Sequence, residues 1–374
     1  MSKMEVRKLG DIEDLGIIEM GRGNVISKND ILSTPGNYPV YSSSSSNNGE
    51  IGRYGKYMFD DERITWSIDG GGKLFYRNNI KYSVTNVCGW LKVLDEKKII
   101  SKYLYYLLIN QWQKLNFNYS HKAHPSVIRN EYYVPNIEIK VQEEIVKILD
   151  SFTNLIDALN EELSLRQKQF EYYREKLLTF DHKSILKPIN EIGTLFRGNG
   201  LQKKDFVDEG VGCIHYGQIY TKLGFSLSKP LTYVTKETAK PLTKVRKGDL
   251  VIACTSENIE DVCKSVVWEG EEEIVTGGHA CVLRHNENPR YIGYFFQTHQ
   301  FFMQKKQYAY GAKVIDIKTE KLGEILIPIP PLAIQQSIVE KLDAFESLIA
   351  SLKEEIALRQ KQYEYYREKL LTFD

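Results

Sequence analysis

Residues 166–181 read RQKQFEYYREKLLTFD and residues 359–374 read RQKQYEYYREKLLTFD, so the two stretches differ at a single position. They stand 193 positions apart, and the same offset relates the upstream LDSF of residues 149–152 to the LDAF of residues 342–345. Repetition at a fixed offset is the sequence signature of a duplicated structural unit. The sequence therefore predicts a chain built from two copies of one unit.

Each copy carries apolar residues in alternating steps of four and three, the spacing of a coiled-coil seam. Neither segment contains Gly or Pro, so each is predicted to be one helix of roughly 36 residues and about 54 Å, at ~1.5 Å per residue. The globular block between the segments permits antiparallel pairing of the two helices. The expected seam residues are Leu149, Phe152, Ile156, Leu159, Leu163, Arg166, Leu342, Phe345, Ile349, Leu352, Ile356 and Arg359.

Both seams include an arginine at the same position, Arg166 and Arg359. A polar seam residue commonly fixes the register of a coiled coil at a cost in stability. The alternative is an arginine stem that lies along the seam and leaves its guanidinium group in water. The sequence leaves both interpretations open.

Length and composition indicate an ordinary soluble protein of two domains, with 374 residues, 42% hydrophobic and 26% charged. No apolar run approaches the ~18 residues of a membrane span, and MSKMEVRKLGDIED lacks the apolar core of a signal peptide, so a cytoplasmic location is expected. The five cysteines form no C-x-x-C pair and are expected to be reduced and mostly buried, without a disulfide framework or zinc site.

Charge is segregated along the chain although the net charge is only +1. Residues 1–140 carry 19 Lys and Arg against 15 Asp and Glu, and residues 182–334 carry 20 against 17. The repeated segments are acidic, with 5 against 9 in residues 141–181 and 6 against 8 in residues 335–374. A polyanion is therefore expected to meet the globular blocks rather than the helices.

The two globular blocks share a motif near their beginnings. RGN stands at residues 22–24 and again at 197–199, and a lysine and an aspartate follow at the same spacing in both blocks. The offset here is 175, so the second unit is 18 residues longer between this motif and its tail. Related frames with different interiors suit two domains that recognise different ligands.

Strand patterns alternate with turn residues in both blocks, which predicts an α+β fold. Strands are predicted over residues 64–68, 73–77, 84–93, 250–253 and 280–283, and helices over residues 101–115 and 291–306. The stretch GNYPVYSSSSSNNG, residues 36–49, is predicted to be a surface loop rather than a strand. Residues 70–72 are three glycines that suit a hairpin turn, with a phosphate cradle as the alternative.

No catalytic, cofactor or metal site is predicted. FRGNG at residues 196–200 matches the F-x-G-x-G by which adenine methyltransferases bind their methyl donor, but no Asp/Asn-Pro-Pro-Tyr/Phe loop follows. The chain lacks G-x-x-x-x-G-K-[ST] and G-x-S-x-G, and His121 and His124 have no neighbouring carboxylate or thiol. The loops are instead rich in hydroxyl, amide, aromatic and basic side chains that suit base edges and phosphates.

The order of block, long helix, second block and near-identical helix resembles the specificity subunit of type I restriction–modification systems. The resemblance is carried by GNYPVYSSS at residues 36–44, by Gly-Asp at 248–249 before a strand, and by IPIPPLAIQQSIVEKLD at 327–343. It covers essentially the whole chain. One departure is that no proline pair precedes the first helix, although Gln142 matches Gln335.

The resemblance implies two related α/β target recognition domains, residues 1–141 and 182–334, that each read one half of a bipartite, asymmetric site in double-stranded DNA. It also implies two antiparallel coiled-coil spacer helices, residues 142–181 and 335–374, related by a pseudo-two-fold internal repeat. The implied protein is non-catalytic and needs no cofactor of its own. It docks modification (methyltransferase) subunits, expected in two copies, and restriction and motor subunits complete an adenine methyltransferase and ATP-dependent endonuclease.

The helix length predicts the spacing of the DNA site. A helix of about 54 Å spans about 16 base pairs at ~3.4 Å each, and one DNA turn is ~34–36 Å. With domains near the ends of the helices, half-site centres are expected about 10–15 base pairs apart, with a gap of about 5–9 unspecified bases.

Residue type and position in the predicted loops indicate the candidate DNA contacts. In the first block they are Tyr41, Ser43, Ser44, Asn47, Asn48, Trp66, Asp69, Asn86, Lys122 and His124. In the second block they are His215, Tyr216, Gln218, Thr255, Ser256, His279, Tyr310 and Lys313.

Two other functional classes remain open from the sequence. One is a DNA-recognition scaffold for a stand-alone methyltransferase without a nuclease. The other is an adaptor whose coiled coil is the functional surface and which does not bind DNA. Salt-sensitive DNA affinity of the complex, and co-purification with or without a motor subunit, distinguish the three.

Overall fold

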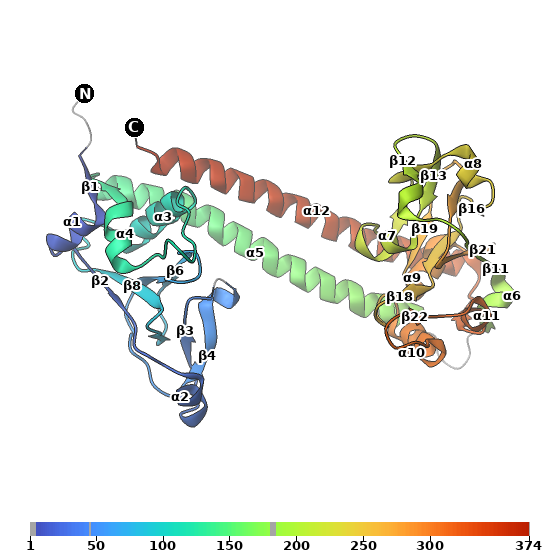
Figure 1. Cartoon of the computed structure of the whole chain (residues 1–374), viewed down its shortest axis with the longest axis horizontal. Coiled ribbons are helices and arrows are strands. Elements are labelled where there is room, and N and C mark those ends of the chain that lie inside the picture. The colour runs from blue at the N-terminus through green and yellow to red at the C-terminus, as the bar shows by residue number, and fades with distance from the viewer. Residues whose placement is uncertain (1–4, 45, 180–184, 374) are drawn as a thin grey trace. The chain divides into compact units, whose positions relative to one another are not determined.

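The computed structural model describes residues 5–44, 46–179 and 185–373, so the last residues of the two repeated stretches, 180–181 and 374, lie outside the described residues. The chain divides into two compact units, the first made of Met1–Asn160 with Glu354–Asp374 and the second of Glu161–Lys353. Each unit combines one globular block with the beginning of one long helix and the end of the other (Figure 1).

The globular block of the first unit is built on two small sheets. One has the order β2-β8-β5-β6 and is antiparallel throughout, and the other has the order β4-β3-β7, with β7 parallel to β3. A third pairing joins β1 to β9 near the beginning of the long helix. The elements are β1 (Val6–Lys8), α1 (Leu9–Asp14), β2 (Ile18–Arg22), α2 (Lys28–Ser33), β3 (Tyr38–Tyr41), β4 (Glu50–Tyr54), β5 (Arg63–Ser67), β6 (Leu74–Arg77), β7 (Ser83–Val84), β8 (Cys88–Val93), α3 (Ser101–Trp112), α4 (Pro125–Glu131) and β9 (Tyr133–Pro135).

The second globular block repeats this frame with larger sheets. Their orders are β11-β21-β17-β19-β14 and β12-β15-β13-β20-β16, and two-stranded pairings join β18 to β22 and β10 to β23. The strands are β10 (Leu186–Pro188), β11 (Gly193–Arg197), β12 (Phe206–Val207), β13 (Val211–Ile214), β14 (Ser226–Leu227), β15 (Thr232–Val234), β16 (Thr243–Val245), β17 (Leu250–Ala253), β18 (Thr255–Ser256), β19 (Ser265–Trp268), β20 (Ile274–Thr276), β21 (Ala280–His285), β22 (Ile315–Asp316) and β23 (Leu326–Pro328). The helices are α6 (Ile189–Ile192), α7 (Tyr216–Thr221), α8 (Lys236–Ala239), α9 (Pro289–Phe295), α10 (His299–Tyr308) and α11 (Thr319–Gly323).

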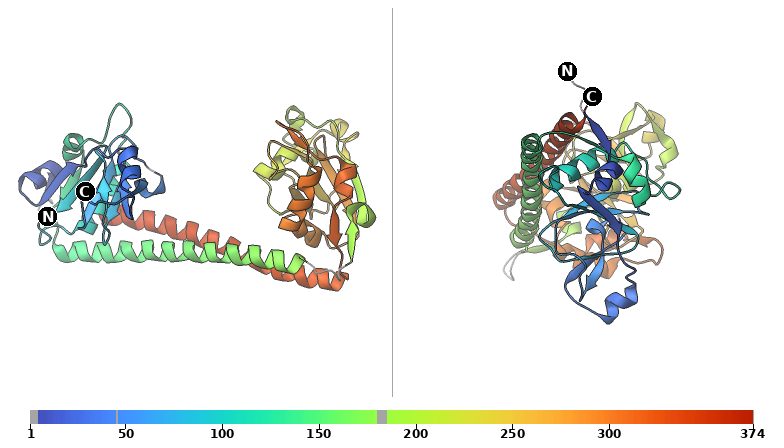
Figure 2. Two further views of the ribbon diagram at one scale, coloured as in Figure 1. Left: turned by 90° about the horizontal axis from the view of Figure 1, so that it is seen from below. Right: turned by 90° about the vertical axis from the view of Figure 1, so that its left-hand side faces the viewer.

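The two long helices are α5 (Ile139–Leu178) and α12 (Leu332–Leu371), each of 40 residues. They begin three residues before the boundaries predicted at 142 and 335. In each unit they run side by side along one side of the globular block (Figure 2). None of the described residues forms a helix long and apolar enough to cross a membrane.

Ring stacking shows how the helices pair. Phe152 stacks on Tyr366 in the first unit and Tyr173 stacks on Phe345 in the second, both with centroids 5.4 Å apart. Adding the 193-residue offset to 152 and 173 gives 345 and 366, so both units make the same contact with the two helices exchanged. The predicted antiparallel coiled coil and its pseudo-two-fold repeat are confirmed.

The two seam arginines are held by their own helices. Arg166 Nη2 lies 3.3 Å from Glu162, and Arg359 Nη2 lies 2.7 Å from Glu355, in each case one turn earlier. Both arginine side chains are more than a third exposed. The arrangement matches the interpretation in which the stem covers the seam and the guanidinium group reaches water. All twelve predicted seam residues are buried or half-buried.

A buried glutamine joins each long helix to its globular block. Gln142 and Gln335 are 1% and 0% exposed. Gln142 Oε1 accepts from the backbone N–H of Ile100 at 2.9 Å, and Gln335 Oε1 accepts from that of Asn288 at 3.0 Å. These are equivalent bonds in the two units, and they show why the amide recurs at this position of the repeat.

Eight residues further along each helix, a tyrosine hydroxyl of each block donates to a helix carboxylate. Tyr106 bonds to Asp150 and Tyr294 to Asp343, both at 2.6 Å. Burial, together with the carboxylate, raises the pKa of both tyrosines, so they remain protonated donors. The repeated aspartate thus serves attachment of the helix rather than coiled-coil pairing.

Several predicted elements are confirmed and three are corrected. The strands at 64–68, 73–77, 250–253 and 280–283 form, and glycines 70–72 make the predicted hairpin turn between β5 and β6. The prediction that residues 36–49 contain no strand is wrong, because Tyr38–Tyr41 is the central strand β3 and the turn formers only flank it.

The other two corrections concern breaks within predicted elements. Residues 84–93 divide into β7 and β8, because a turn from Thr85 to Cys88 carries the chain from one sheet to the other. Residues 291–306 divide into α9 and α10. Thr298 makes this break, since its hydroxyl donates to Phe295 O at 2.7 Å and accepts from Phe301 N at 3.2 Å.

Candidate nucleic-acid interface

Strand register aligns the two globular blocks residue by residue. Arg22 of β2 is paired with Gly89 of β8, and Arg197 of β11 is paired with Cys281 of β21. The recurrent RGN motif therefore occupies the same place in both frames. Its glycine is needed for a close approach of backbones, because a Cβ on Gly198 would overlap the carbonyl group of Gly277.

The strands on the other side of β8 and β21, which are β5 and β17, extend the alignment. Trp66 of β5 is paired with Gly89, and Ile252 of β17 is paired with Cys281. Trp66 and Ile252 are thus equivalent, and so are the residues three positions later, Asp69 and Thr255. Both lie just beyond the end of the strand.

A third equivalence comes from the segment that runs beside these residues. The backbone N–H of Ala123 donates to Ile68 O, and that of Ile317 donates to Cys254 O. The preceding residues, Lys122 and Asp316, are therefore equivalent as well. In each block one polar pair occupies the same point of the frame.

In the first unit this pair is an ion pair. Lys122 Nζ lies 2.9 Å from Asp69 Oδ1, and both side chains are about one-third to two-fifths exposed. The ammonium group also lies 4.8 Å from the ring centroid of Tyr119, which is 82% exposed. A cation and an exposed aromatic ring side by side suit a phosphate and a base or sugar.

The serine and asparagine loop, residues 42–44 and 46–49, lies beside this ion pair. Thr85 Oγ1 donates to Ser42 Oγ at 2.9 Å, which joins the loop to the segment carrying the exposed Asn86. The carbonyl oxygen of Ser43 lies against Gly70, where a Cβ would overlap it. The structure therefore brings together, on one face, the predicted contacts Ser43, Ser44, Asn47, Asn48, Asp69, Asn86 and Lys122.

Three predicted contacts of the first block have structural roles instead. Tyr41 is 5% exposed, and Trp66 is 1% exposed with its Nε1 donating to Ala123 O at 2.7 Å. His124 caps α4, where its Nδ1 lies 2.8 Å from Ser126 Oγ. Tyr41 and Trp66 are therefore too deep to touch a ligand, and the ring of His124 is engaged in the helix cap.

In the second unit the equivalent pair joins a hydroxyl to a carboxylate. Thr255 Oγ1 donates to Asp316 Oδ2 at 2.9 Å and lies 3.0 Å from His279 Nδ1. Because the threonine has one hydroxyl hydrogen, His279 Nδ1 is the donor in the second bond. Thr255 is buried whereas His279 is exposed, so the threonine orients the imidazole towards solvent.

Two more side chains bind the same carboxylate. Arg197 Nη2 lies 2.9 Å from Asp316 Oδ2, and Tyr310 donates to Asp316 Oδ1 at 3.2 Å. Sequence reasoning missed Asp316, and it used Arg197 as part of the repeated RGN motif and of the discounted F-x-G-x-G match without predicting a contact for it. The recurrence of arginine at 22 and 197 was the available signal, whereas nothing in the sequence pointed to Asp316.

Of the remaining predicted residues of the second block, some are buried and stabilise the fold, and the others are accessible at the surface. His215 and Gln218 form a capping box at the start of α7, and burial lowers the pKa of His215. Ser256 is 4% exposed and accepts from Asn258 N. The half-buried ring of Tyr216 lies 5.0 Å from that of His279, and Lys313 is exposed. Tyr216, His279, Tyr310 and Lys313 are therefore the accessible members.

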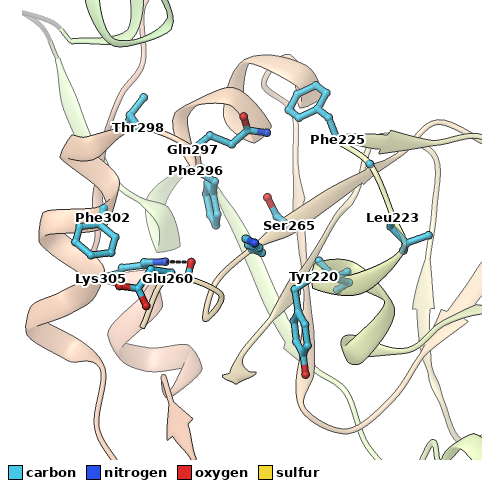
Figure 3. A pocket seen from close by; sticks show the side chains of 13 residues that line it. Tyr220, Leu223, Phe225, Glu260, Ser265, Phe296, Gln297, Thr298, Phe302 and Lys305 are labelled. Atoms are coloured by element: carbon cyan, nitrogen blue, oxygen red, sulfur yellow. Dashed lines mark hydrogen bonds between the residues drawn. The ribbon is translucent and has the colours of Figure 1, made fainter. Parts of the chain in front are cut away.

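A cavity of about 450 Å³ opens elsewhere on the second unit, and none of the predicted contacts lines it (Figure 3). Its floor includes Lys305, which is 4% exposed and whose Nζ donates to Glu260 O at 3.1 Å and Val262 O at 2.6 Å. Burial lowers the pKa of this ammonium group. The lysine ties down the loop that follows β18.

Among the described residues, no group of three or more His, Cys, Asp or Glu residues could hold a metal ion. All five cysteines are free and buried, as the sequence predicted. Burial raises the pKa of Cys88 to about 12, so this thiol is inert at neutral pH.

Comparison with known proteins adds to this geometry. A family model described as the type I restriction modification DNA specificity domain matches residues 1–165 and again 186–358. The specificity subunit of the type I restriction enzymes EcoR124I and EcoR124II from Escherichia coli is 30% identical over 298 residues, which are 75% of this chain and 72% of that protein. A putative type I specificity subunit of Mycoplasma pneumoniae is 28% identical over 377 residues, covering 97% of this chain and 96% of its own length.

A solved structure shows the same fold. The S subunit of a type I restriction–modification system from M. genitalium matches with a TM-score of 0.62 at 14% sequence identity. The match covers 100% of this chain and 97% of the other.

Proposed function

Because this chain belongs to the type I restriction–modification DNA specificity family, we propose that it is the non-catalytic DNA-recognition subunit of such a system. Each globular block reads one half of a bipartite DNA site. The long helices dock the modification subunits that carry out adenine methylation. Restriction and motor subunits complete an ATP-dependent endonuclease.

The observation that carries this proposal is the different chemistry at one equivalent point of the two frames. Asp69 and Lys122 stand where Thr255 and Asp316 stand in the other unit. A lysine ammonium group donates hydrogen bonds and attracts phosphate, whereas a carboxylate accepts, for example from a cytosine amino group. Two globular blocks that share one fold but carry different polar groups at this point are expected to recognise different half-sites. The full DNA site is therefore asymmetric.

The proposed DNA contacts are the accessible residues gathered on each face. In the first unit they are Ser43, Ser44, Asn47, Asn48, Asp69, Asn86 and Lys122. In the second they are Tyr216, His279, Tyr310 and Lys313, to which Arg197 and Asp316 are added. Thr255 is kept as the residue that orients His279.

The partner surface is proposed on the long helices. Four outward-facing apolar positions occur as pairs at the 193-residue offset, and members of a pair are equally exposed, for example Tyr172 and Tyr365 at 58% and 60%. The pairs are Val141 and Ile334, Leu155 and Leu348, Leu165 and Leu358, and Tyr172 and Tyr365. Each unit thus offers the same apolar surface, which supports docking of one modification subunit per unit, two in all.

Long-read sequencing of DNA methylated by the assembled complex tests the function. The expected result is a bipartite motif with unequal halves and a gap of about 5–9 unspecified bases. A continuous palindrome would contradict the proposal. Absence of salt-sensitive DNA affinity in the complex would favour the adaptor without DNA binding, and co-purification with methyltransferase but never with a motor subunit would favour the stand-alone scaffold.

A further inference from the structure

A buried arginine lies directly under the serine and asparagine loop of the first unit. Arg77, at the end of β6, is 2% exposed. In the described part of the chain no carboxylate forms an ion pair with it, and burial lowers the pKa of its guanidinium group. A buried charge without a counter-ion is costly, so its position calls for a role beyond core packing.

Three contacts of the guanidinium group bear on the loop, and a fourth places its carbon 4.7 Å from the Phe75 ring centroid. Its Nε donates to Thr65 Oγ1 at 3.1 Å, and its carbon lies 3.5 Å from the ring centroid of Tyr41. Its Nη2 donates to the backbone carbonyl of Asn48 at 2.7 Å. Thr65 and Tyr41 are buried in the sheets, so the first two contacts hold the arginine while the third holds the loop.

The loop needs such support because its backbone is unusual. Asn47, Asn48 and Gly49 follow one another with φ of 45°, 55° and 81°, all in the left-handed region. Asparagine tolerates this region, but two successive asparagines there persist only when surrounding contacts determine the conformation. That conformation leaves both asparagine side chains exposed.

We infer that Arg77 is a specificity-determining positioning residue, which sets the direction in which Asn47 and Asn48 present their amides to the bases of the first half-site. This inference rests on the proposed function. An asparagine amide can pair with the N6 and N7 of adenine only when its plane is fixed, so the loop backbone controls the discrimination. Arg77 itself lies too deep to touch DNA.

The test uses the full-length chain assembled with its modification subunits, in wild-type form and as Arg77→Met. Methylation of a DNA library randomised in both half-sites, read by long-read sequencing, gives the base preference at every position. We expect Arg77→Met to relax the preference at the first half-site positions that Asn48→Ala also relaxes, by about tenfold or more in the ratio of correct to incorrect bases. The second half-site should be unchanged, and hydrogen exchange of the 42–54 segment should become faster.

Two further variants keep the test decisive. Arg63→Met removes another buried guanidinium of the same unit, which is paired with Arg77 across β5 and β6 but is bonded to Asp61 rather than to the loop, and it should leave the motif unchanged. Thr65→Val removes only the acceptor of Arg77 Nε and replaces Arg77→Met if that variant does not assemble.

The outcomes separate the inference from the function on which it rests. An unchanged first half-site in Arg77→Met, or equal relaxation of both half-sites, would overturn the inference. Relaxation by Arg63→Met at the same positions would also overturn it, because the effect would then follow from general destabilisation of the unit. If the wild-type complex methylates no bipartite motif, the proposed function fails instead.

Discussion

Replacing Gln335 by methionine should destabilise the second unit strongly. The side chain is fully buried and makes three hydrogen bonds, from Asn288 N at 3.0 Å, to Pro330 O at 2.8 Å and to the Glu287 carboxylate at 2.7 Å. Methionine fills a similar volume but makes none of these bonds, so the cost is mainly that of the lost hydrogen bonds.

The magnitude follows from the number and kind of bonds. At ~1 kcal/mol for each neutral bond and ~1.5–3 kcal/mol for the bond to the carboxylate, the free energy of unfolding should fall by roughly 4 kcal/mol. For a unit of this size, ~1 kcal/mol shifts the midpoint of thermal unfolding by ~2–4 °C, so a decrease of about 8–16 °C is expected.

Gln142→Met is the matched control in the first unit. Gln142 bonds to Ile100 N, Lys98 O and Ile137 O, all neutral groups, so its loss should cost about 3 kcal/mol and affect only the first unit. Hydrogen exchange read by mass spectrometry follows both units in one sample. A loss below about 1 kcal/mol in Gln335→Met, or equal loosening of both units, would refute the reasoning.

Three other perturbations address His285, the proposed phosphate contact of Lys122 and the buried Lys305. Burial lowers the pKa of His285 below its ordinary 6.5, so the contribution of His285 to the stability of the second unit is present above pH 6.5 and is lost as the pH falls through the lower folded pKa. Unfolding of the second unit should therefore be less sensitive to acid in His285→Phe, and an unchanged pH profile would contradict this. Lys122→Gln should weaken DNA binding of the complex at all sequences and reduce the salt slope by about 1, and a slope equal to that of the wild type would exclude a phosphate contact. Lys305→Met should cost about 1–3 kcal/mol by leaving Glu260 O and Val262 O unpaired, measured by denaturant unfolding; a neutral effect would show that water replaces the lysine.

The sequence predicts the repeated parts of this fold well because their signals are local. The steps of three and four around Leu149 and Leu342 depend only on helix periodicity, and the glycines at 70–72 depend only on turn geometry. Tyr38–Tyr41 was mistaken for a loop because its burial depends on β4 and β7, which approach from elsewhere in the chain.

The candidate faces could be predicted only in part, for a related reason. Residue type suggests which side chains have groups suited to DNA, but exposure decides which of them are accessible. Trp66 and His215 have suitable groups, and yet tertiary packing and helix capping take them out of reach. Asp316 lies beside Thr255 through a pairing of strands 61 residues apart, so no local pattern could reveal it.

The chain segments that make up the two units also set an order for folding during synthesis. The second unit is a single stretch of chain, Glu161–Lys353, and can form as soon as that stretch has left the ribosome. The first unit needs Glu354–Asp374, since Leu371 is 3% exposed in its core and its carbonyl accepts from Asn110. The block that is translated first is therefore completed last. Until the last turns of α12 emerge, it exposes the apolar surface that Leu371 covers in the folded unit.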